Sequence, residues 1–272
     1  MNTDTARPAG DPGGGAIVAL PALADNYIWL VRQGGDAAVV DPGVAQPVLA
    51  ALQAGGLRLR AILLTHHHND HVGGVDELVQ ATGAAVYGPA GERLPRCDHP
   101  LAEGDRVSLD APALDLRVLD VPGHTAGHIA YHGRAAGQPV LFCGDTLFAA
   151  GCGRLFEGTP AQMHESLGKL ARLPGDLRVC CAHEYTLANL RWALAVEPGN
   201  RALQDWQEQA GRLRAAGLPT VPTSIARELG TNPFLRVAQA DVAQAAASWA
   251  GRPLATPVEV FAALREWKNE FK

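Results

Sequence analysis

The sequence has five cysteines, and no two of them have C-x-x-C spacing. An odd number of cysteines without such pairs indicates neither a disulfide framework nor a zinc knuckle. No apolar stretch is long enough to cross a bilayer, and the early apolar run at residues 16–24 lacks the basic flank of a signal peptide. We therefore expect a cytoplasmic protein with reduced thiols and no membrane association.

The chain also has no excess of positive charge. The formal net charge is −5 and the isoelectric point is near 6.0, which argues against a nucleic-acid partner. No apolar surface stripe or coiled-coil heptad stands out, so we expect a monomer. Gly-x-Ser-x-Gly is absent too, which removes the serine nucleophile of the α/β-hydrolases.

Apolar residues are plentiful enough for a full core, since 47% of the 272 residues are hydrophobic. This length accommodates one large domain and a small one. Residues 1–15, rich in Gly and Pro, are expected to form a disordered leader. The rest divides into a first domain at 16–185 and a helical C-terminal domain at 186–272, because helical spacing dominates after residue 185. The helices expected there are residues 190–196, 201–216, 238–249 and 258–267.

Short apolar runs recur in the first domain, and each leads to a polar group in a turn. The runs are residues 37–40, 61–64, 116–119, 140–142 and 177–181, and they lead to Asp41, the segment 65–71, His124, Asp145 and His183. Helical patterns lie between the runs, at residues 48–54, 75–82 and 162–173. The predicted class is α/β, with one site along a sheet edge.

The most informative segment is Thr65-His66-His67-His68-Asn69-Asp70-His71. Imidazole and carboxylate groups are costly to bury without partners, and a metal ion removes that cost. An extended backbone points alternate side chains to the same side, so His66 and His68 can converge while His67 points away. The segment therefore predicts a metal site.

A helix is expected soon after this segment, entered through Gly73 and Gly74. The helical turn would carry Asp70 and His71 to a second position beside the first pair of histidines. The motif can thus serve two metals at once.

Three more residues could complete the site, namely His124, Asp145 and His183. Each alone is more often a packed histidine or a turn residue. Together with the motif they give five His and two Asp, about the number that two metals with a bridging carboxylate need. Asp41 and His128 remain open, either as supports of the ligands or as turn and packing residues.

The T-H-x-H-x-D-H motif is typical of the metallo-β-lactamase superfamily. Narrower signals are the segments 20–27, 144–148, 151–154, 157–159, 183–186, 232–236 and 265–271. On these segments the chain resembles the glyoxalase II family, the hydroxyacylglutathione hydrolases, from about residue 16 to the end. The resemblance implies an α/β fold, a metallo-β-lactamase-like αββα sandwich followed by a small α-helical C-terminal domain.

The resemblance also implies two divalent metal ions, with Zn expected first and Fe or Mn compatible with the same ligands. One ion would be held by His66, His68 and His124, the other by Asp70, His71 and His183, with Asp145 bridging them beside a water or hydroxide. Asp70 and Asp145 are the residues with an expected catalytic role, and Asp70 would orient the hydroxide or carry its proton.

In the family, the glutathione moiety binds between the two domains. The matching residues are Arg154, Tyr185, Arg265 and Lys268, and Phe156 stands where some members have a tyrosine. The phenylalanine removes one expected hydrogen bond but leaves the substrate class unchanged. Glutathione is a net anion, so the three cations would complement it. Without the resemblance, Arg265 and Lys268 would be interpreted as solvated charges.

The implied activity is hydrolysis of S-2-hydroxyacylglutathione thioesters by a metal-bridging hydroxide. S-D-lactoylglutathione would give D-lactate and glutathione, as in methylglyoxal detoxification. A thiol has a pKa of about 8.5, so the thiolate can leave without an obligatory proton donor. The rival interpretation within the superfamily is a glutathione persulfide dioxygenase with a single iron, and the helical tail that carries Arg265 and Lys268 argues against it.

Overall fold

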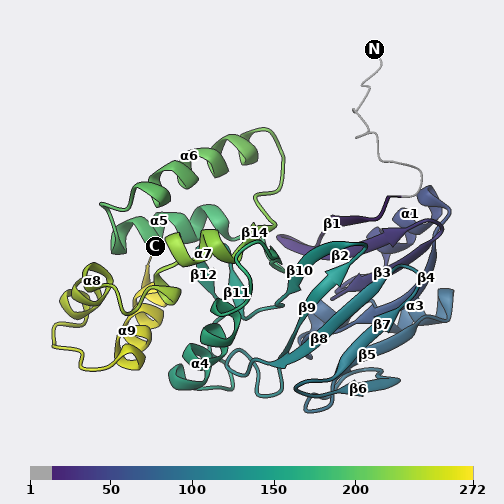
Figure 1. Ribbon diagram of the computed structural model, residues 1–272, viewed down its shortest axis with the longest axis horizontal. Coiled ribbons are helices and arrows are strands. Elements are labelled where there is room, and N and C mark those ends of the chain that lie inside the picture. Colours follow the sequence, from purple (N-terminus) through teal and green to yellow (C-terminus); the bar gives the residue numbers. More distant parts are fainter. Residues whose placement is uncertain (1–13, 272) are drawn as a thin grey trace.

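The computed structural model describes residues 14–271, which form two facing β-sheets with a group of helices beside them (Figure 1). The leader predicted at residues 1–15 therefore falls almost wholly outside the described residues. In this part of the chain each of the two sheets has six strands. None of the described helices is both long and apolar enough to cross a membrane.

The strands of the first sheet follow the chain order. They are β1 (Ala16–Ala22), β2 (Asn26–Gln33), β3 (Asp36–Val40), β4 (Arg58–Leu63), β5 (Ala85–Pro89) and β6 (His99–Leu101). The first three strands pair antiparallel, whereas β3 to β6 run parallel. Parallel neighbours place their carboxyl ends at one edge, which is where the loop after β4 carries the histidine motif.

In the second sheet, strands that are not consecutive in the chain lie side by side. Its strands, in spatial order, are β14 (Thr223–Ser224), β13 (Arg178–Cys180), β10 (Gln138–Phe142), β9 (Ile129–Ala135), β8 (Leu114–Asp120) and β7 (Arg106–Leu109). A separate hairpin consists of β11 (Leu147–Phe148) and β12 (Gly151–Cys152). Strand β14 comes from the C-terminal part of the chain, so that part contributes the edge of this sheet.

The helices fall into two sets. In the first part of the chain they are α1 (Gln46–Gly55), α2 (Asn69–Val72), α3 (Val75–Thr82) and α4 (Pro160–Ala171), and in the second α5 (Thr186–Val196), α6 (Arg201–Ala215), α7 (Ile225–Thr231), the 3-10 turn η1 (Pro233–Leu235), α8 (Ala240–Ala250) and α9 (Pro257–Glu270). Both α4 and α9 begin with a Thr-Pro capping box, in which Thr159 or Thr256 caps the first turn.

Strict alternation along the strands explains why the two sheets stack. In β2, Trp29 and Val31 point into the core between the sheets, whereas Ile28 and Leu30 point to the other face. That other face packs against α1 and α3, through side chains such as Val48 and Leu78. The second sheet adds its own apolar side to the shared core. The predicted αββα sandwich is confirmed.

The C-terminal helices form the second expected unit, a helical domain whose core joins that of the sandwich. Trp192 of α5 stacks on Phe234 of η1 at a centroid distance of 4.8 Å, and Phe234 also contacts Phe261 of α9. All three side chains are fully buried. Helix α9 packs on α4 as well as on α8, which fixes the end of the chain beside the sandwich.

Most expected elements are present with shifted ends, but two details were wrong. First, the site was expected along one sheet edge, whereas its residues follow strands of both sheets. Second, Gly73 and Gly74 have ordinary helical backbone angles. They are required for close approach, since a Cβ on Gly74 would lie 2.5 Å from the carbonyl carbon of Val44. The backbone there contacts the loop after β3.

Candidate active site

Loops at the ends of both sheets bring the seven predicted ligands together. The motif 65–71 follows β4 of the first sheet and runs into α2. His124, Asp145 and His183 follow β8, β10 and β13 of the second sheet. Each ligand thus sits just beyond a buried strand, where the backbone is fixed but the side chain is free to turn into the gap between the sheet edges.

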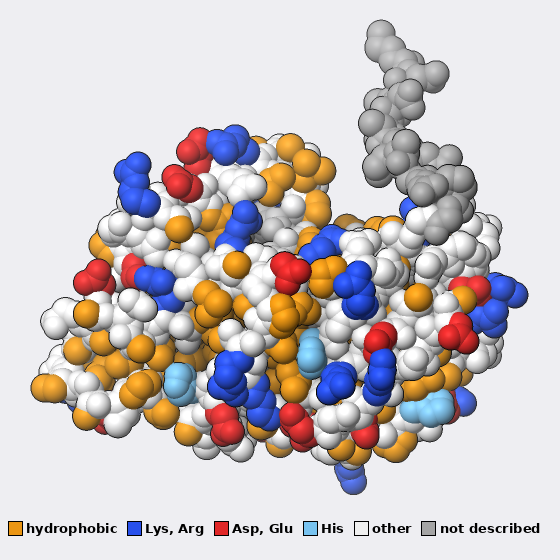
Figure 2. All heavy atoms as spheres, viewed as in Figure 1, with side chains coloured by type: hydrophobic (Ala, Val, Ile, Leu, Met, Phe, Trp, Pro, Cys, Tyr) orange, Lys and Arg blue, Asp and Glu red, His pale blue; other side chains and the backbone are white. Residues whose placement is uncertain are grey.

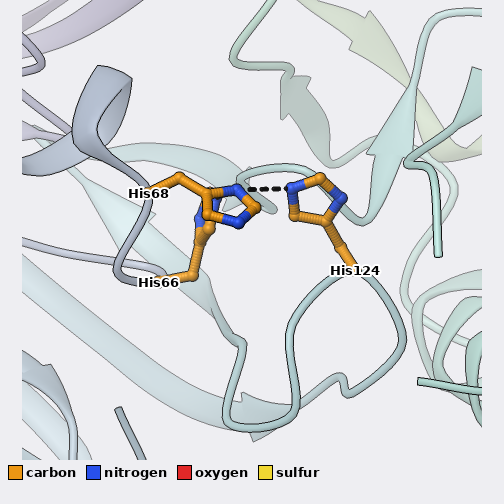
Figure 3. Close-up of side chains that lie close together, drawn as sticks. All are labelled: His66, His68 and His124. Atoms are coloured by element: carbon orange, nitrogen blue, oxygen red, sulfur yellow. Dashed lines mark hydrogen bonds between the residues drawn. The ribbon is translucent and has the colours of Figure 1, made fainter. Parts of the chain in front are cut away.

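His66, His68 and His124 point toward one another (Figure 3). Nδ1 of His68 lies 3.2 Å from Nε2 of His66 and 3.0 Å from Nε2 of His124. Donor atoms about 2.1 Å from a tetrahedral metal lie about 3.4 Å from each other. The three nitrogens therefore fit one common ion.

Asp70, His71 and His183 form a second group that could hold a metal. Oδ2 of Asp70 lies 3.5 Å from Nε2 of His71 and 3.5 Å from Nε2 of His183. His67, predicted to point away, belongs to neither group.

Asp145 lies between the two groups and faces both. Its Oδ1 is 3.3 Å from Nε2 of His71 and 3.3 Å from Nε2 of His183, whereas its Oδ2 is 3.2 Å from Nε2 of His124. One carboxylate with its oxygens aimed at separate ligand groups fits the bridging position of a two-metal site.

Other residues fix the ring orientation of the ligand histidines. Nδ1 of His71 lies 3.1 Å from Oδ2 of Asp41, and Nδ1 of His183 lies 2.8 Å from Oδ1 of Asp25. Nδ1 of His124 contacts the backbone oxygen of Arg154 at 2.8 Å. Because these acceptors hold the Nδ1 proton, each Nε2 is left as a lone-pair donor toward the site.

Asp41 and His128, which the sequence left open, both support the site. Asp41 accepts hydrogen bonds from the backbone N–H and the hydroxyl of Thr65, in addition to its contact with His71. The ring of His128 stacks on that of His66 with centroids 4.6 Å apart, and its Nε2 accepts from the backbone N–H of Asp145. His128 is therefore a buried support outside the two ligand groups.

The electrostatics hold His66 and Asp145 in metal-binding form, whereas Asp145 outweighs burial and raises the pKa of His71 and of His183. Burial holds the pKa of His66 well below its usual range, so its ring is neutral. Burial would raise the pKa of Asp145, but the rings of His71 and His183 outweigh it and hold the pKa well below the ordinary value. A neutral imidazole and an ionised carboxylate are the forms that bind metals.

A pocket of about 500 Å³ opens directly on the site. Its walls include the candidate ligands His68, Asp70, His124, Asp145 and His183, and all five residues predicted to bind substrate, Arg154, Phe156, Tyr185, Arg265 and Lys268. Phe156 is 63% exposed, and its ring packs edge-on against His68 and His124. On the face shown in Figure 2, hydrophobic side chains gather in the recess between the sandwich and the helical domain.

Three cations line the pocket without acidic partners. None of the Lys or Arg ion pairs among residues 14–271 involves Arg154, Arg265 or Lys268. Arg265 is nearly buried and donates to the backbone oxygen of Cys152, while its Nε has no hydrogen-bond partner. Burial and the nearby arginines lower the pKa of Lys268 to about 8. Such a wall favours an anionic ligand.

Several supporting residues were missed by sequence reasoning. Asp25 holds His183, and Nδ2 of Asn26 donates to Oδ2 of Asp70 at 3.1 Å. Both belong to the Asp-Asn-Tyr segment at residues 25–27. The sequence marked this segment only as part of the resemblance to the glyoxalase II family. Glu92 contacts the motif from a loop after β5, and nothing in its local sequence marks it.

The fold and the ligand set together define a metal-dependent enzyme of the metallo-β-lactamase type. Residues 23–183 match the family model described as the metallo-beta-lactamase superfamily, and residues 184–271 match that described as the hydroxyacylglutathione hydrolase C-terminus. The chain belongs to the hydroxyacylglutathione hydrolase family, and it is a hydrolase.

Curated relatives with the name hydroxyacylglutathione hydrolase match nearly the whole chain. The hydroxyacylglutathione hydrolase of Alkalilimnicola ehrlichii is 59% identical over 93% of this chain and 98% of its own length. That of Methylobacillus flagellatus is 55% identical over 94% of this chain and 99% of its own. These matches do not favour the persulfide dioxygenase interpretation.

Solved structures confirm the fold. ETHE1 from Myxococcus xanthus aligns with a TM-score of 0.59 at 24% identity, covering 93% of this chain and 97% of its own. TTHA1623, solved in a di-iron-bound form, aligns with a TM-score of 0.50 at 34% identity over 62% of this chain and 91% of its own.

Proposed function

We propose that the chain hydrolyses S-2-hydroxyacylglutathione thioesters, with S-D-lactoylglutathione as the leading substrate, to a 2-hydroxy acid and glutathione. This reaction would serve methylglyoxal detoxification. The observation that carries the proposal is the position of Asp145. It lies between two groups that could hold a metal and at the wall of a pocket whose cations form no ion pair within residues 14–271. The names of the relatives support the substrate class.

Two divalent metals would fill the site, held by the seven residues described above. Zn is the first expectation, because a set of imidazoles and carboxylates suits it, and Fe or Mn suits the same set. The di-iron form of TTHA1623 supports two metals. When bound, the metals would supply a water of lowered pKa and a positive charge beside the thioester carbonyl oxygen.

The protein's own residues would orient the reactants. Asp70 is fixed by Asn26 at one oxygen, and its side chain is 40% exposed to the pocket, so it can accept and hold the proton of the attacking water. Attack on the carbonyl carbon forms a C–O bond and breaks the C–S bond. The departing thiolate takes the electron pair and needs no obligatory donor, because thiols have a pKa of about 8.5.

The glutathione moiety would lie along the part of the pocket formed by the helical domain. Lys268 and Arg265 of α9 and Arg154 of the sandwich complement its carboxylates. Tyr185 stacks on His183 with ring planes 3° apart and lines the same pocket. Phe156 would cover the first ligand group as an apolar wall.

We further propose a domain division near Tyr185, with residues 16–185 holding the metals and residues 186–272 binding substrate. The two matched ranges, 23–183 and 184–271, support this division. A cytoplasmic monomer without a nucleic-acid partner remains our expectation. In support, acidic and basic side chains are interspersed on the face shown in Figure 2.

The test compares two thioesters with the same D-lactoyl group, one of glutathione and one of coenzyme A. The protein should hydrolyse the glutathione thioester, lose this activity on chelation and regain it with Zn²⁺. Its kcat/KM for the coenzyme A thioester should be lower by at least about tenfold, the loss of about one charge-assisted contact. Equal rates on both would contradict glutathione recognition, and no metal-dependent hydrolysis would contradict the proposed reaction.

A further inference from the structure

Glu92 is a nearly buried carboxylate that lies beside the candidate active site but outside the pocket. It sits in the turn after β5, and its side chain is only 1% exposed. Neither of the two ligand groups includes it. The reaction described above has no role for it, so its buried charge needs another explanation.

Both oxygens of Glu92 accept hydrogen bonds, but from different segments. Oε2 accepts from the backbone N–H of His67 at 3.1 Å and contacts Nδ1 of the same residue. Oε1 accepts from the hydroxyl of Thr125 at 2.6 Å and from the backbone N–H of Gly127 at 2.9 Å. One carboxylate thus joins the motif to the loop after β8.

The residues that Glu92 holds are direct neighbours of the first ligand group. His67 stands between His66 and His68, and Thr125 follows His124. These three ligands come from two segments of the chain, and their side chains meet at the site (Figure 3). The carboxylate of Glu92 accepts hydrogen bonds from both of these segments.

The packing around Glu92 leaves little freedom. A Cβ on Gly127 would lie 2.6 Å from the backbone oxygen of Gly91 and 3.0 Å from Cγ of Glu92, so the two loops touch backbone to backbone. On the other side, Glu157 accepts from the backbone N–H of Ala126 at 2.7 Å. Two carboxylates therefore hold the 125–127 loop.

His67, Glu92 and Glu157 also lie close enough to hold a metal. A carboxylate offers about four acceptor positions, and the four donors from His67, Thr125 and Gly127 already occupy those of Glu92. This carboxylate is therefore a satisfied structural group, not a ligand of a third ion.

We propose that Glu92 is a positioning residue for the first metal site, and that it sets the distance between the His66–His68 segment and His124. The inference rests on the proposed metal centre. Loss of the carboxylate would let the two segments separate, and the site they share would weaken while the site of Asp70, His71 and His183 would not. Residues that hydrogen-bond to metal ligands typically contribute about 10- to 100-fold to metal affinity.

The experiment measures metal affinity directly, with metal-free protein loaded with Co²⁺ and titrated with a chromophoric chelator. Glu92→Gln keeps the shape of the side chain but replaces one acceptor by a donor. Glu77→Gln, an exposed glutamate on α3, is the matched control. His124→Ala and His183→Ala identify the first and second site in the titration. Thr125→Val removes a single contact to Glu92 and serves as a milder variant should Glu92→Gln fail to fold.

We expect Glu92→Gln to weaken the first site by about 10- to 100-fold and to leave the second within about twofold of wild type. Excess metal should restore its turnover with an unchanged KM, since Glu92 does not line the pocket. Wild-type affinity at both sites in Glu92→Gln and Thr125→Val, or equal weakening of both sites, would overturn the inference and leave the proposed function intact. Wild-type protein that binds no metal at these sites would overturn both.

Discussion

Nε2 of His71 and Oδ1 of Asp145 lie 3.3 Å apart at the centre of the site, and neither of these buried atoms has a hydrogen-bond partner among the described residues. An unsatisfied polar atom in a protein interior costs about 1–3 kcal/mol. Two such atoms facing each other, with a histidine group on either side, are explained most simply by a metal ion between them. Both atoms would then be ligands.

The first prediction concerns Asp145 itself. Asp145→Ala removes both oxygens that face the ligand groups, so the bound metal should fall well below that of wild type and thioester hydrolysis should be lost. Elemental analysis after dialysis, together with a turnover assay, measures both. Asp76→Ala, on the exposed side of α3, should retain metal and activity. Wild-type metal content in the Asp145 variant would show that the carboxylate is no ligand.

The second prediction tests the support of His71 by Asp41. Asp41→Asn keeps the size of the side chain but replaces one carboxylate oxygen by an NH2 group. The variant can therefore no longer accept all the hydrogen bonds from Thr65 and His71. The ring of His71 should lose its fixed orientation, and affinity at the second metal site should fall by about 10- to 100-fold. A chelator titration measures this fall. The same affinity in variant and wild type would limit Asp41 to a role in the turn after β3.

The candidate ligands could be picked out in the sequence because their signal is local. Four of them lie within one short motif, and each remaining ligand directly follows an apolar strand. Asp41 and His128 could be named as possible supports, but Asp25 and Glu92 could not, since Asp25 and His183 are 158 residues apart and Glu92 lies 25 residues from His67. Stacking of the two sheets brings Asp25 to His183, and the pairing of β4 with β5 brings Glu92 to His67.

The fold was predictable to a similar extent. Short apolar runs and helical patterns predicted several of the strands and most of the helices. The observed ends differ where a capping residue starts a helix, as at Thr159 before α4. Periodicity could not show that β14 crosses from the helical part to join the second sheet, because a two-residue strand has no pattern of its own.

The third prediction follows from the lowered pKa of Lys268, which is about 8. Its ammonium is charged below this pH and neutral above it, so attraction for an anionic substrate should weaken as the pH rises past 8. A profile of kcat/KM against pH reports the ionisable groups of the free enzyme, and it should decline above a pH of about 8. Lys268→Ala should have a lower kcat/KM without this decline, whereas Lys169→Ala should keep the wild-type profile. A decline that persists in Lys268→Ala belongs to another group.

The fourth prediction concerns Glu228, which accepts from Thr223 and from the backbone N–H of Ala150 and has its pKa raised by burial to about 7. The folded protein therefore binds this proton more tightly than the unfolded chain. The contribution to the free energy of unfolding is full below pH 4.5 and is lost as the pH rises through 7, on the order of 3 kcal/mol in all.

Glu228→Gln should remove this dependence, because the amide stays neutral, and Thr223 can turn its hydroxyl to accept from it. Urea unfolding at a series of pH values measures the effect. The wild-type curve should decline between pH 4.5 and 7 more steeply than that of the variant. Parallel curves would mean that Glu228 stays ionised in the folded protein.

The central claim is that this site hydrolyses a glutathione thioester with metal ions. The most direct measurement follows the loss of S-D-lactoylglutathione absorbance with purified protein, before and after chelation, and measures oxygen uptake on glutathione persulfide in parallel. We predict metal-dependent loss of the thioester and no oxygen uptake. Oxygen uptake without loss of the thioester would contradict the account and make the chain a dioxygenase.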